Sequence, residues 1–223
     1  MATTLGVIGG LGPAATLDFH AKLLGHSSGA RDQDHLRLLI DSDPTVPDRN
    51  AAIAGTGESP GPQLARMAAG LQAGGADLIV MACNAAHAWE DDIRAAISVP
   101  FLSIIEVAVE RARAHSPKRV GLLAADATIR SGIYQKAFAR HGIEAVNPDQ
   151  VAFMELLYRI KAGERGEGVE QGMLALADSL SGVDVLIAAC TEVPLVLKGH
   201  RLPFIDAGDE LAREALARLG RAA

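Results

Sequence analysis

Short apolar runs alternate along the chain with longer segments in which apolar residues recur at a helical period. The apolar runs predict strands over Leu5–Gly9, Leu36–Asp41, Leu78–Ala82, Phe101–Ile104, Val120–Ala124, Val185–Ala189 and Phe204–Asp206. The longer segments predict helices over Ala14–Leu24, Pro62–Ala73, Arg130–Arg140, Val169–Leu180 and Asp209–Leu219. Strands that alternate with helices are typical of βαβ units. The predicted fold class is therefore α/β, with parallel sheets covered by helices on both faces.

One sequence pattern occurs twice. Gly75–Asn84 (GADLIVMACN) aligns without a gap with Gly182–Thr191 (GVDVLIAACT), and each segment ends an apolar run with a cysteine, Cys83 or Cys190. Weaker matches flank this pair in the same order, namely Gly6 with Gly121 and Pro100 with Pro203. An ordered repeat of this kind predicts two similar α/β lobes related by a pseudo-twofold axis.

The predicted lobes comprise residues 1–98 plus 206–223 and residues 99–205. The last helix, Asp209–Leu219, is expected to pack back on the first lobe. No Pro/Gly/Ser-rich linker separates the two halves, so the lobes are expected to pack closely. We therefore predict that the active site lies in the cleft between them.

Composition narrows the functional classes. The chain has 223 residues and a formal net charge of −6, without the basic face that a general nucleic-acid binder needs. Its apolar runs fall well short of the roughly 20 residues of a membrane-spanning helix. The first residues also lack the basic region of a signal peptide. We therefore expect a cytoplasmic protein that binds neither nucleic acid nor membrane and keeps its cysteines reduced.

The two cysteines stand at the carboxyl ends of predicted parallel strands, where open α/β sheets place their ligand sites. Each cysteine is followed by residues that start a helix, so the helix dipole is expected to favour the thiolate. A pseudo-twofold axis turns Cys83 and Cys190 toward one shared cleft, one on each side of a bound molecule. Two thiols so placed suit removal of a proton from one face of an acidic carbon and return of a proton to the other.

Three other roles remain open for the cysteines. The first is that of an inert buried side chain, and the second is that of a partner in a disulfide. The third is that of a zinc ligand, because Cys83 and His87 are four residues apart on one predicted helix face. No second closely spaced Cys/His pair completes a zinc site, so we predict no metal. The shared sequence context favours paired catalytic cysteines, because structural cysteines rarely recur within a repeat.

With these residues in view, the chain resembles the aspartate/glutamate racemase superfamily, most closely its aspartate racemase and broad-specificity amino-acid racemase branch. The resemblance covers essentially the whole chain, and an ordered set of motifs carries it. These motifs are Gly9–Pro13, Arg31–His35, Pro47–Arg49, Cys83–Asn84 with His87, Ser131–Lys136, Lys161–Gly163 and Cys190–Glu192. The resemblance implies a cofactor-independent racemase with two similar α/β domains, which uses one cysteine from each as base and acid. It also implies aspartate or glutamate as substrate, and a homodimer.

The resemblance further implies which residues bind the substrate. Arg49 is expected to clamp the distal carboxylate with two parallel hydrogen bonds, and Lys161 to add a second cation over it. Glu192 is expected to accept hydrogen bonds from the substrate ammonium. The other substrate-binding candidates are Gly10, Leu11, Gly12, Asn84, Ala85, Thr128 and Thr191. Of these, Thr128 and Thr191 also suit helix capping.

The first cysteine motif departs from the family pattern, which usually reads Cys-Asn-Thr-Ala-His. Ala85 stands where that pattern has threonine, so a hydroxyl that helps to hold the substrate's α-carboxylate is missing. A hydrogen bond to a charged group is worth about 1.5–3 kcal/mol. The departure therefore bears on substrate preference and catalytic efficiency, whereas the fold and the two-thiol chemistry do not depend on it.

Three other functions remain as alternatives. Gly10–Ala15 fits the G-x-G-x-x-G/A fingerprint of dinucleotide-binding enzymes, with Asp41 as the ribose-binding acid, so an NAD(P)-dependent oxidoreductase is the runner-up. That function gives no reason for the duplicated cysteines. A related isomerase or decarboxylase commonly needs only one thiol. A non-catalytic binding protein would bind amino acids without exchanging their α-protons.

Overall fold

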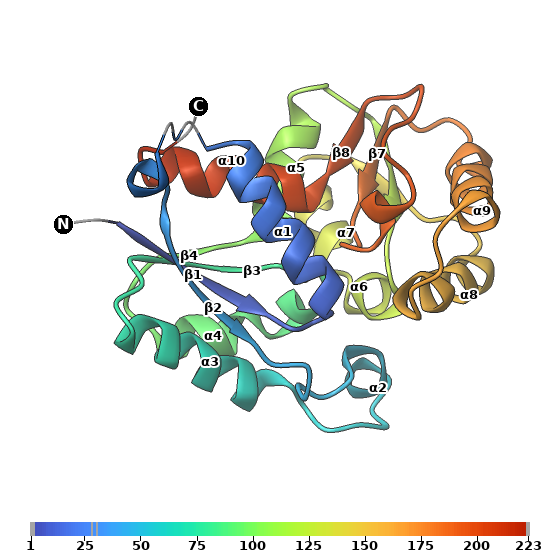
Figure 1. Cartoon of the computed structure of the whole chain (residues 1–223). Coiled ribbons are helices and arrows are strands. Elements are labelled where there is room, and N and C mark those ends of the chain that lie inside the picture. The colour runs from blue at the N-terminus through green and yellow to red at the C-terminus, as the bar shows by residue number, and fades with distance from the viewer. Residues whose placement is uncertain (1–2, 28, 30, 222–223) are drawn as a thin grey trace.

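The structure is a computed structural model that describes residues 3–27, 29 and 31–221. Its strands form two parallel four-stranded sheets (Figure 1). The strands are β1 Thr4–Gly9, β2 Arg37–Ser42, β3 Leu78–Met81, β4 Phe101–Leu102, β5 Arg119–Leu123, β6 Glu144–Val146, β7 Val185–Ala188 and β8 Phe204–Asp206. The α-helices are α1 Pro13–Gly25, α2 Arg49–Ile53, α3 Gly61–Ala73, α4 Glu90–Ala96, α5 Ile104–Arg113, α6 Asp126–Ser131, α7 Ile133–Ala139, α8 Gln150–Lys161, α9 Glu167–Ser179 and α10 Ala207–Arg218. Short 3-10 helices cover Asp32–Asp34, Ala85–Trp89 and Val193–Leu195.

The two sheets repeat the same topology. The strand order is β2-β1-β3-β4 in the first sheet and β6-β5-β7-β8 in the second, and every neighbouring pair is parallel. The strands that precede the two cysteines, β3 and β7, therefore hold equivalent central positions. This arrangement confirms the α/β class and the two similar lobes that the sequence repeat predicts.

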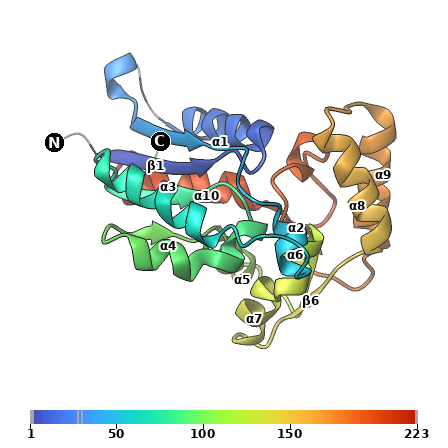
Figure 2. The ribbon, with the colours of Figure 1, turned by 90° about the horizontal axis from the view of Figure 1, so that it is seen from below.

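Helices cover both faces of each sheet. An outer core packs α3 and α4 on the first sheet, and another packs α8 and α9 on the second (Figure 2). A central core joins apolar residues of both sheets with α1, α5, α7 and α10. Helix α10 packs against α1 and α5, as expected for a last helix that returns to the first lobe. No helix within the described residues is both long and apolar enough to cross a bilayer.

Several predicted elements differ from the structure. The helix predicted over Arg130–Arg140 is broken into α6 and α7 at Gly132, whose φ of 68° is left-handed. Strand β6 was not predicted, and the polar loop after the second strand contains the short helix α2. Strand β4 pairs with β3, so the first sheet extends beyond residue 98, the predicted limit of the first lobe. The lobe boundaries themselves stay a prediction.

Candidate active site

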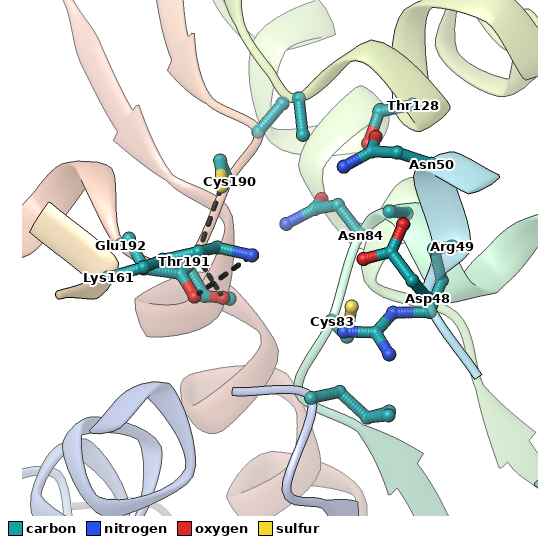
Figure 3. A pocket seen from close by; sticks show the side chains of 14 residues that line it. Asp48, Arg49, Asn50, Cys83, Asn84, Thr128, Lys161, Cys190, Thr191 and Glu192 are labelled. Carbon is teal, nitrogen blue, oxygen red and sulfur yellow. Dashed lines mark hydrogen bonds and ion pairs between the residues drawn. The ribbon is translucent and has the colours of Figure 1, made fainter. Parts of the chain in front are cut away.

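A pocket lies where the carboxyl ends of β3 and β7 face each other, and both cysteines line it. The space between its lining atoms measures about 380 Å³, open solvent at the mouth included. Figure 3 shows Cys190 on one side with Lys161 and Glu192, and Cys83 on the other side near Arg49. The full lining is Leu11, Asp48, Arg49, Asn50, Cys83, Asn84, Ala85, Ala125, Thr128, Lys161, Ala189, Cys190, Thr191 and Glu192. The structure thus brings together ten of the twelve site residues expected from the sequence, from both halves of the chain.

Both cysteines are buried, and the protonated form of the thiol is favoured at each position. Burial raises the pKa of Cys83, although the positive charges of Arg49 and Lys161 oppose the rise. Burial also raises the pKa of Cys190 well above its ordinary value, and the carboxylate of Glu192 adds to the rise. The segment after each cysteine begins as a 3-10 helix, and backbone N–H groups at its start, those of Ala86 and Glu192, lower the pKa of Cys83 and Cys190 respectively. The start of each segment therefore favours the thiolate, but burial outweighs this contribution at both cysteines.

The carboxylate of Glu192 is the centre of the hydrogen bonding around Cys190. The Cys190 thiol donates to Oε2 of Glu192 at 3.1 Å, and the Thr191 hydroxyl donates to the same oxygen at 3.3 Å. The other oxygen, Oε1, lies 3.9 Å from Nζ of Lys161. Glu192 is 5 % exposed, so this carboxylate acts at short range and with little screening by solvent.

Lys161 is the last residue of α8 and reaches the pocket from the second lobe. Burial lowers the pKa of Lys161, but the negative charge of Glu192, together with that of the two cysteines when they are ionised, outweighs burial. Its pKa therefore lies above the ordinary value. A lysine whose pKa is raised in this way stays cationic at neutral pH and is available to an anionic group.

Arg49 is the first residue of α2 and reaches the pocket from the first lobe. Its Nη1 donates to the carbonyl oxygens of Val46 at 3.1 Å and Pro47 at 3.0 Å. These bonds fix the guanidinium to its own loop and leave its other N–H groups without a protein partner among the described residues. The guanidinium of Arg49 is therefore held in place and can donate two parallel hydrogen bonds to a carboxylate.

A side-chain hydrogen bond joins helix α2 to the second lobe. Oδ1 of Asn50 accepts from the backbone N–H of Ala127, in the first turn of α6, at 2.8 Å. The side chain of Asp48 caps α2 by accepting from the N–H of Ala51 at 2.8 Å. Asp48 and Asn50 therefore set the position of Arg49. Asp48 lies within the Pro47–Arg49 motif but was given no role from the sequence, and Asn50 was not singled out.

Two buried polar atoms at the pocket have no hydrogen-bond partner within the described residues. They are Nδ2 of Asn84 and Oγ1 of Thr128. Oδ1 of Asn84 accepts from the buried hydroxyl of Tyr134 at 2.7 Å, which fixes the orientation of the amide and turns Nδ2 away from Tyr134. Thr128 lies inside α6 and does not cap it. Buried polar groups are normally satisfied, so both atoms indicate a place for a polar ligand.

The glycine-rich loop after β1 contributes one side chain, Leu11, to the pocket lining. Gly10 has a φ of 84°, and a Cβ there would lie 2.5 Å from backbone atoms of Asp43, so only glycine fits. Its N–H donates to the hydroxyl of Thr16 at 2.8 Å and so does not cradle a pyrophosphate, as the dinucleotide alternative requires. Gly12 lies beside the pocket, where an added Cβ would be 3.4 Å from Oε1 of Glu192.

His87 is a buried packing residue. Its Nδ1 bonds to the carbonyl oxygen of Cys83 at 2.7 Å, and its Nε2 accepts from the N–H of Ile104 at 3.2 Å. Because both nitrogens are engaged, the Cys83–His87 pair cannot ligate zinc. Within the described residues, no group of three His, Cys, Asp or Glu side chains is placed to hold a metal ion. Both cysteines are free, so no disulfide joins them.

Comparisons with known proteins identify relatives along nearly the whole chain. A family model described as "Asp/Glu/Hydantoin racemase" matches residues 8–215. The broad specificity amino-acid racemase RacX of Bacillus subtilis is 30 % identical over 96 % of both chains. The solved structure of the Picrophilus torridus aspartate racemase superposes with a TM-score of 0.86 and 32 % identity, over 98 % of this chain and 95 % of that one. The glutamate racemase of Campylobacter jejuni shares the fold. Its structure superposes with a TM-score of 0.68 and 21 % identity, over 97 % of this chain and 85 % of that one.

Proposed function

Because the chain belongs to the Asp/Glu/hydantoin racemase family, we propose that it racemises an acidic amino acid, aspartate or glutamate, without a cofactor. Cys83 and Cys190 serve as base and acid on opposite faces of the α-carbon. One observation carries this proposal: the two thiols line opposite sides of one pocket, at the ends of equivalent strands.

The reaction moves one proton on each side of the substrate. The thiolate on one side takes the α-proton, and the electron pair of the broken C–H bond passes into the α-carboxylate as an enolate. The thiol on the other side then donates its proton to the opposite face and becomes a thiolate. The pair carries one proton before and after the reaction, so the enzyme returns to its first state when the reverse reaction runs.

The unpartnered atoms of the pocket supply the stabilisation that this reaction needs. The α-proton of an amino acid is a very weak acid, so donors must be aimed at the charge that develops on the carboxylate. Nδ2 of Asn84 is buried, fixed by Tyr134 and without a protein partner among the described residues. We assign it to the α-carboxylate, together with the backbone N–H of Thr191.

The charges of the pocket support an acidic substrate. Arg49 approaches from the first lobe and Lys161 from the second, so a dicarboxylate can engage a cation from each lobe. Glu192, beside Cys190, is placed to accept from the substrate ammonium. We extend the proposal to a cytoplasmic protein that acts as a homodimer.

The test is racemisation of purified, reduced protein without added cofactor. L-Asp, L-Glu, D-Asp, D-Glu and a panel of neutral amino acids are incubated separately, and chiral chromatography measures the opposite enantiomer. We expect inversion of an acidic amino acid, lowered by about 10³-fold or more in Cys83→Ser and in Cys190→Ser. Inversion of neutral amino acids alone would overturn the acidic assignment. No inversion of any substrate, or full activity in either serine variant, would overturn the two-thiol mechanism.

A further inference from the structure

The motif Ser131–Lys136 has no role in the proposed reaction, yet one of its side chains contacts a residue of the pocket. Gly132 is the C-cap of α6 and the N-cap of α7, so the chain turns there and α7 begins in a new direction. Tyr134, in the first turn of α7, is fully buried. Its ring belongs to the central core and stacks on Phe138, with ring centroids 6.2 Å apart. The phenol hydroxyl therefore needs an acceptor inside that core.

The acceptor is Asn84, which belongs to the other lobe. The Tyr134 hydroxyl donates to Oδ1 of Asn84 at 2.7 Å, and this is the only hydrogen bond of the phenol within the described residues. Burial raises the pKa of Tyr134, so the hydroxyl keeps its proton. Because that proton has no second acceptor in the described part of the chain, the amide of Asn84 must turn its oxygen toward Tyr134.

The side chain of Asn84 is not held by its own segment. Asn84 is the N-cap of the 3-10 helix Ala85–Trp89, but its side chain makes no capping hydrogen bond. The amide therefore lacks the local role that asparagine commonly has at an N-cap. Asn84 is 2 % exposed, and its Nδ2 has no partner among the described residues. In Figure 3 the amide nitrogen points into the space between Cys83 and Cys190.

The orientation of this amide decides what the pocket presents to the substrate. An asparagine amide has two orientations of nearly the same shape, one that donates from Nδ2 and one that presents Oδ1 instead. An oxygen aimed at the α-carboxylate would repel the charge that develops there, whereas Nδ2 stabilises it. We propose that Tyr134 is a positioning residue, which holds the Asn84 amide in the orientation that stabilises the transition state.

This role rests on the proposed racemisation and adds to it a residue outside the pocket. Tyr134 does not line the pocket, so it acts on the substrate through Asn84 alone. Because Tyr134 and Asn84 belong to different lobes, the donor is set in place only while the lobes are packed together. The proposal thereby gives the Ser131–Lys136 motif a function in the reaction.

Removal of the phenol oxygen tests this role. Tyr134→Phe should lower kcat for the proposed acidic substrate about 10-fold or more, because a hydrogen bond to a charged group is lost in the transition state. KM should change by less than about 3-fold, since Arg49 and Lys161 still hold the distal carboxylate. The matched control is Tyr158→Phe, which removes the same atom from a tyrosine that is 55 % exposed on α8. This control should leave both kinetic values unchanged.

A double-mutant cycle separates positioning from packing. Asn84→Ala removes the amide, so adding Tyr134→Phe should lower kcat by less than about 2-fold more. An equal loss of kcat with and without the amide would show that Tyr134 acts through the core and would overturn the proposal.

A second substitution keeps the test decisive even if Tyr134→Phe does not fold. Asn84→Asp retains an acceptor for Tyr134 but places an oxygen where Nδ2 was. This change should lower kcat about 100-fold or more. A wild-type kcat in Asn84→Asp would overturn the proposal, because the orientation of the amide would then have no effect on the reaction.

A measurement without turnover separates this proposal from the proposed function. In protein labelled with ¹⁵N-asparagine, the side-chain amides of Asn50, Asn84 and Asn147 give separate NMR signals, and Asn84→Ala identifies those of Asn84. Tyr134→Phe should shift or broaden the Asn84 signals and leave the others in place. Unmoved Asn84 signals would overturn the proposal whether or not the protein racemises. Shifted signals in a protein that inverts no amino acid would overturn the proposed function, and the catalytic role of Tyr134 with it, but not the contact.

Discussion

Replacing Glu192 with glutamine should make the Cys190 thiol more reactive. In the folded protein the thiol donates to Oε2 of Glu192 at 3.1 Å, so an ionised Cys190 would face a carboxylate at contact distance. Glutamine keeps the size of the side chain and a carbonyl oxygen that can accept from the thiol. The substitution removes only the negative charge. Since that charge raises the pKa of Cys190, its removal should lower the pKa.

The expected size follows from the distances. Two unit charges about 4 Å apart repel by about 4 kcal/mol at an effective dielectric constant of roughly 20. Lys161, with Nζ 3.9 Å from Oε1 of Glu192, offsets part of this repulsion. If half of it remains, about 2 kcal/mol, the thiolate population of Cys190 rises roughly 30-fold below its pKa. A thiolate of lower pKa is also a weaker nucleophile, so the reaction rate should rise by about 6-fold.

The assay is the rate of modification by methyl methanethiosulfonate at pH 8. Both forms carry Cys83→Ser, so that Cys190 is the thiol measured, and the comparison is Glu192 against Glu192→Gln. The opposite change supplies the control: Lys161 lowers the pKa of Cys190, so Lys161→Met should slow the same reaction. A general loosening of the pocket would speed both variants. An unchanged or slower rate in Glu192→Gln, with unaltered circular dichroism, would refute the electrostatic reasoning.

Three further predictions follow from the site. Asn50→Leu removes the acceptor that joins α2 to the second lobe. Because α2 carries Arg49, this change should raise the KM for the proposed acidic substrate about 5-fold or more, with a smaller effect on kcat. Asn50→Asp keeps an acceptor and is the control, so equal KM values in both variants would contradict this role. Ala85→Thr adds a hydroxyl donor for the α-carboxylate and should raise kcat/KM about 10-fold or more, whereas an unchanged value would remove Ala85 from the binding site. The raised pKa values of Cys83 and Cys190 predict a free energy of unfolding that is unaffected by these groups below about pH 9, their ordinary pKa. Above that pH the thiols ionise in the unfolded chain but stay protonated in the folded one, so the free energy of unfolding falls by up to about 1.4 kcal/mol per pH unit for each thiol. Urea unfolding at pH 8 and 10 should show a smaller fall in the double serine variant than in the wild type. Equal falls in the two proteins would contradict this prediction.

The sequence predicted those features that leave a local or repeated pattern. Strands β3 and β7 are continuous apolar runs ending in cysteine, and their shared context placed Cys83 and Cys190 on opposite sides of one cleft. Strand β6 was missed because Glu144–Val146 is short and begins with an exposed glutamate. The helix predicted over Arg130–Arg140 ran through Gly132, whose left-handed φ of 68° ends α6 in the structure.

The parts of the site that were not predicted depend on contacts between distant segments. The hydrogen bond from the N–H of Ala127 to Asn50 joins the two lobes, and no local sequence pattern predicts it. Ala125 and Ala189 line the pocket without any side-chain functional group. The motif located Glu192, but its hydrogen bond with the Cys190 thiol follows from its side-chain conformation. The pKa of each thiol likewise depends on how far burial outweighs the nearby cations.

The central claim, that two thiols act on opposite faces of one carbon, is tested most directly by deuterium incorporation at low conversion. The wild-type protein is incubated in deuterated buffer with one enantiomer of the acidic substrate proposed for it, and the two enantiomers are separated and analysed by mass spectrometry. The account predicts that the product carries one deuterium while the remaining substrate keeps its α-proton, because the acid that delivers the new proton differs from the base that removed the old one. A product that retains the substrate's own proton, or a substrate pool that exchanges as fast as it inverts, would show one base acting on both faces and would contradict the account.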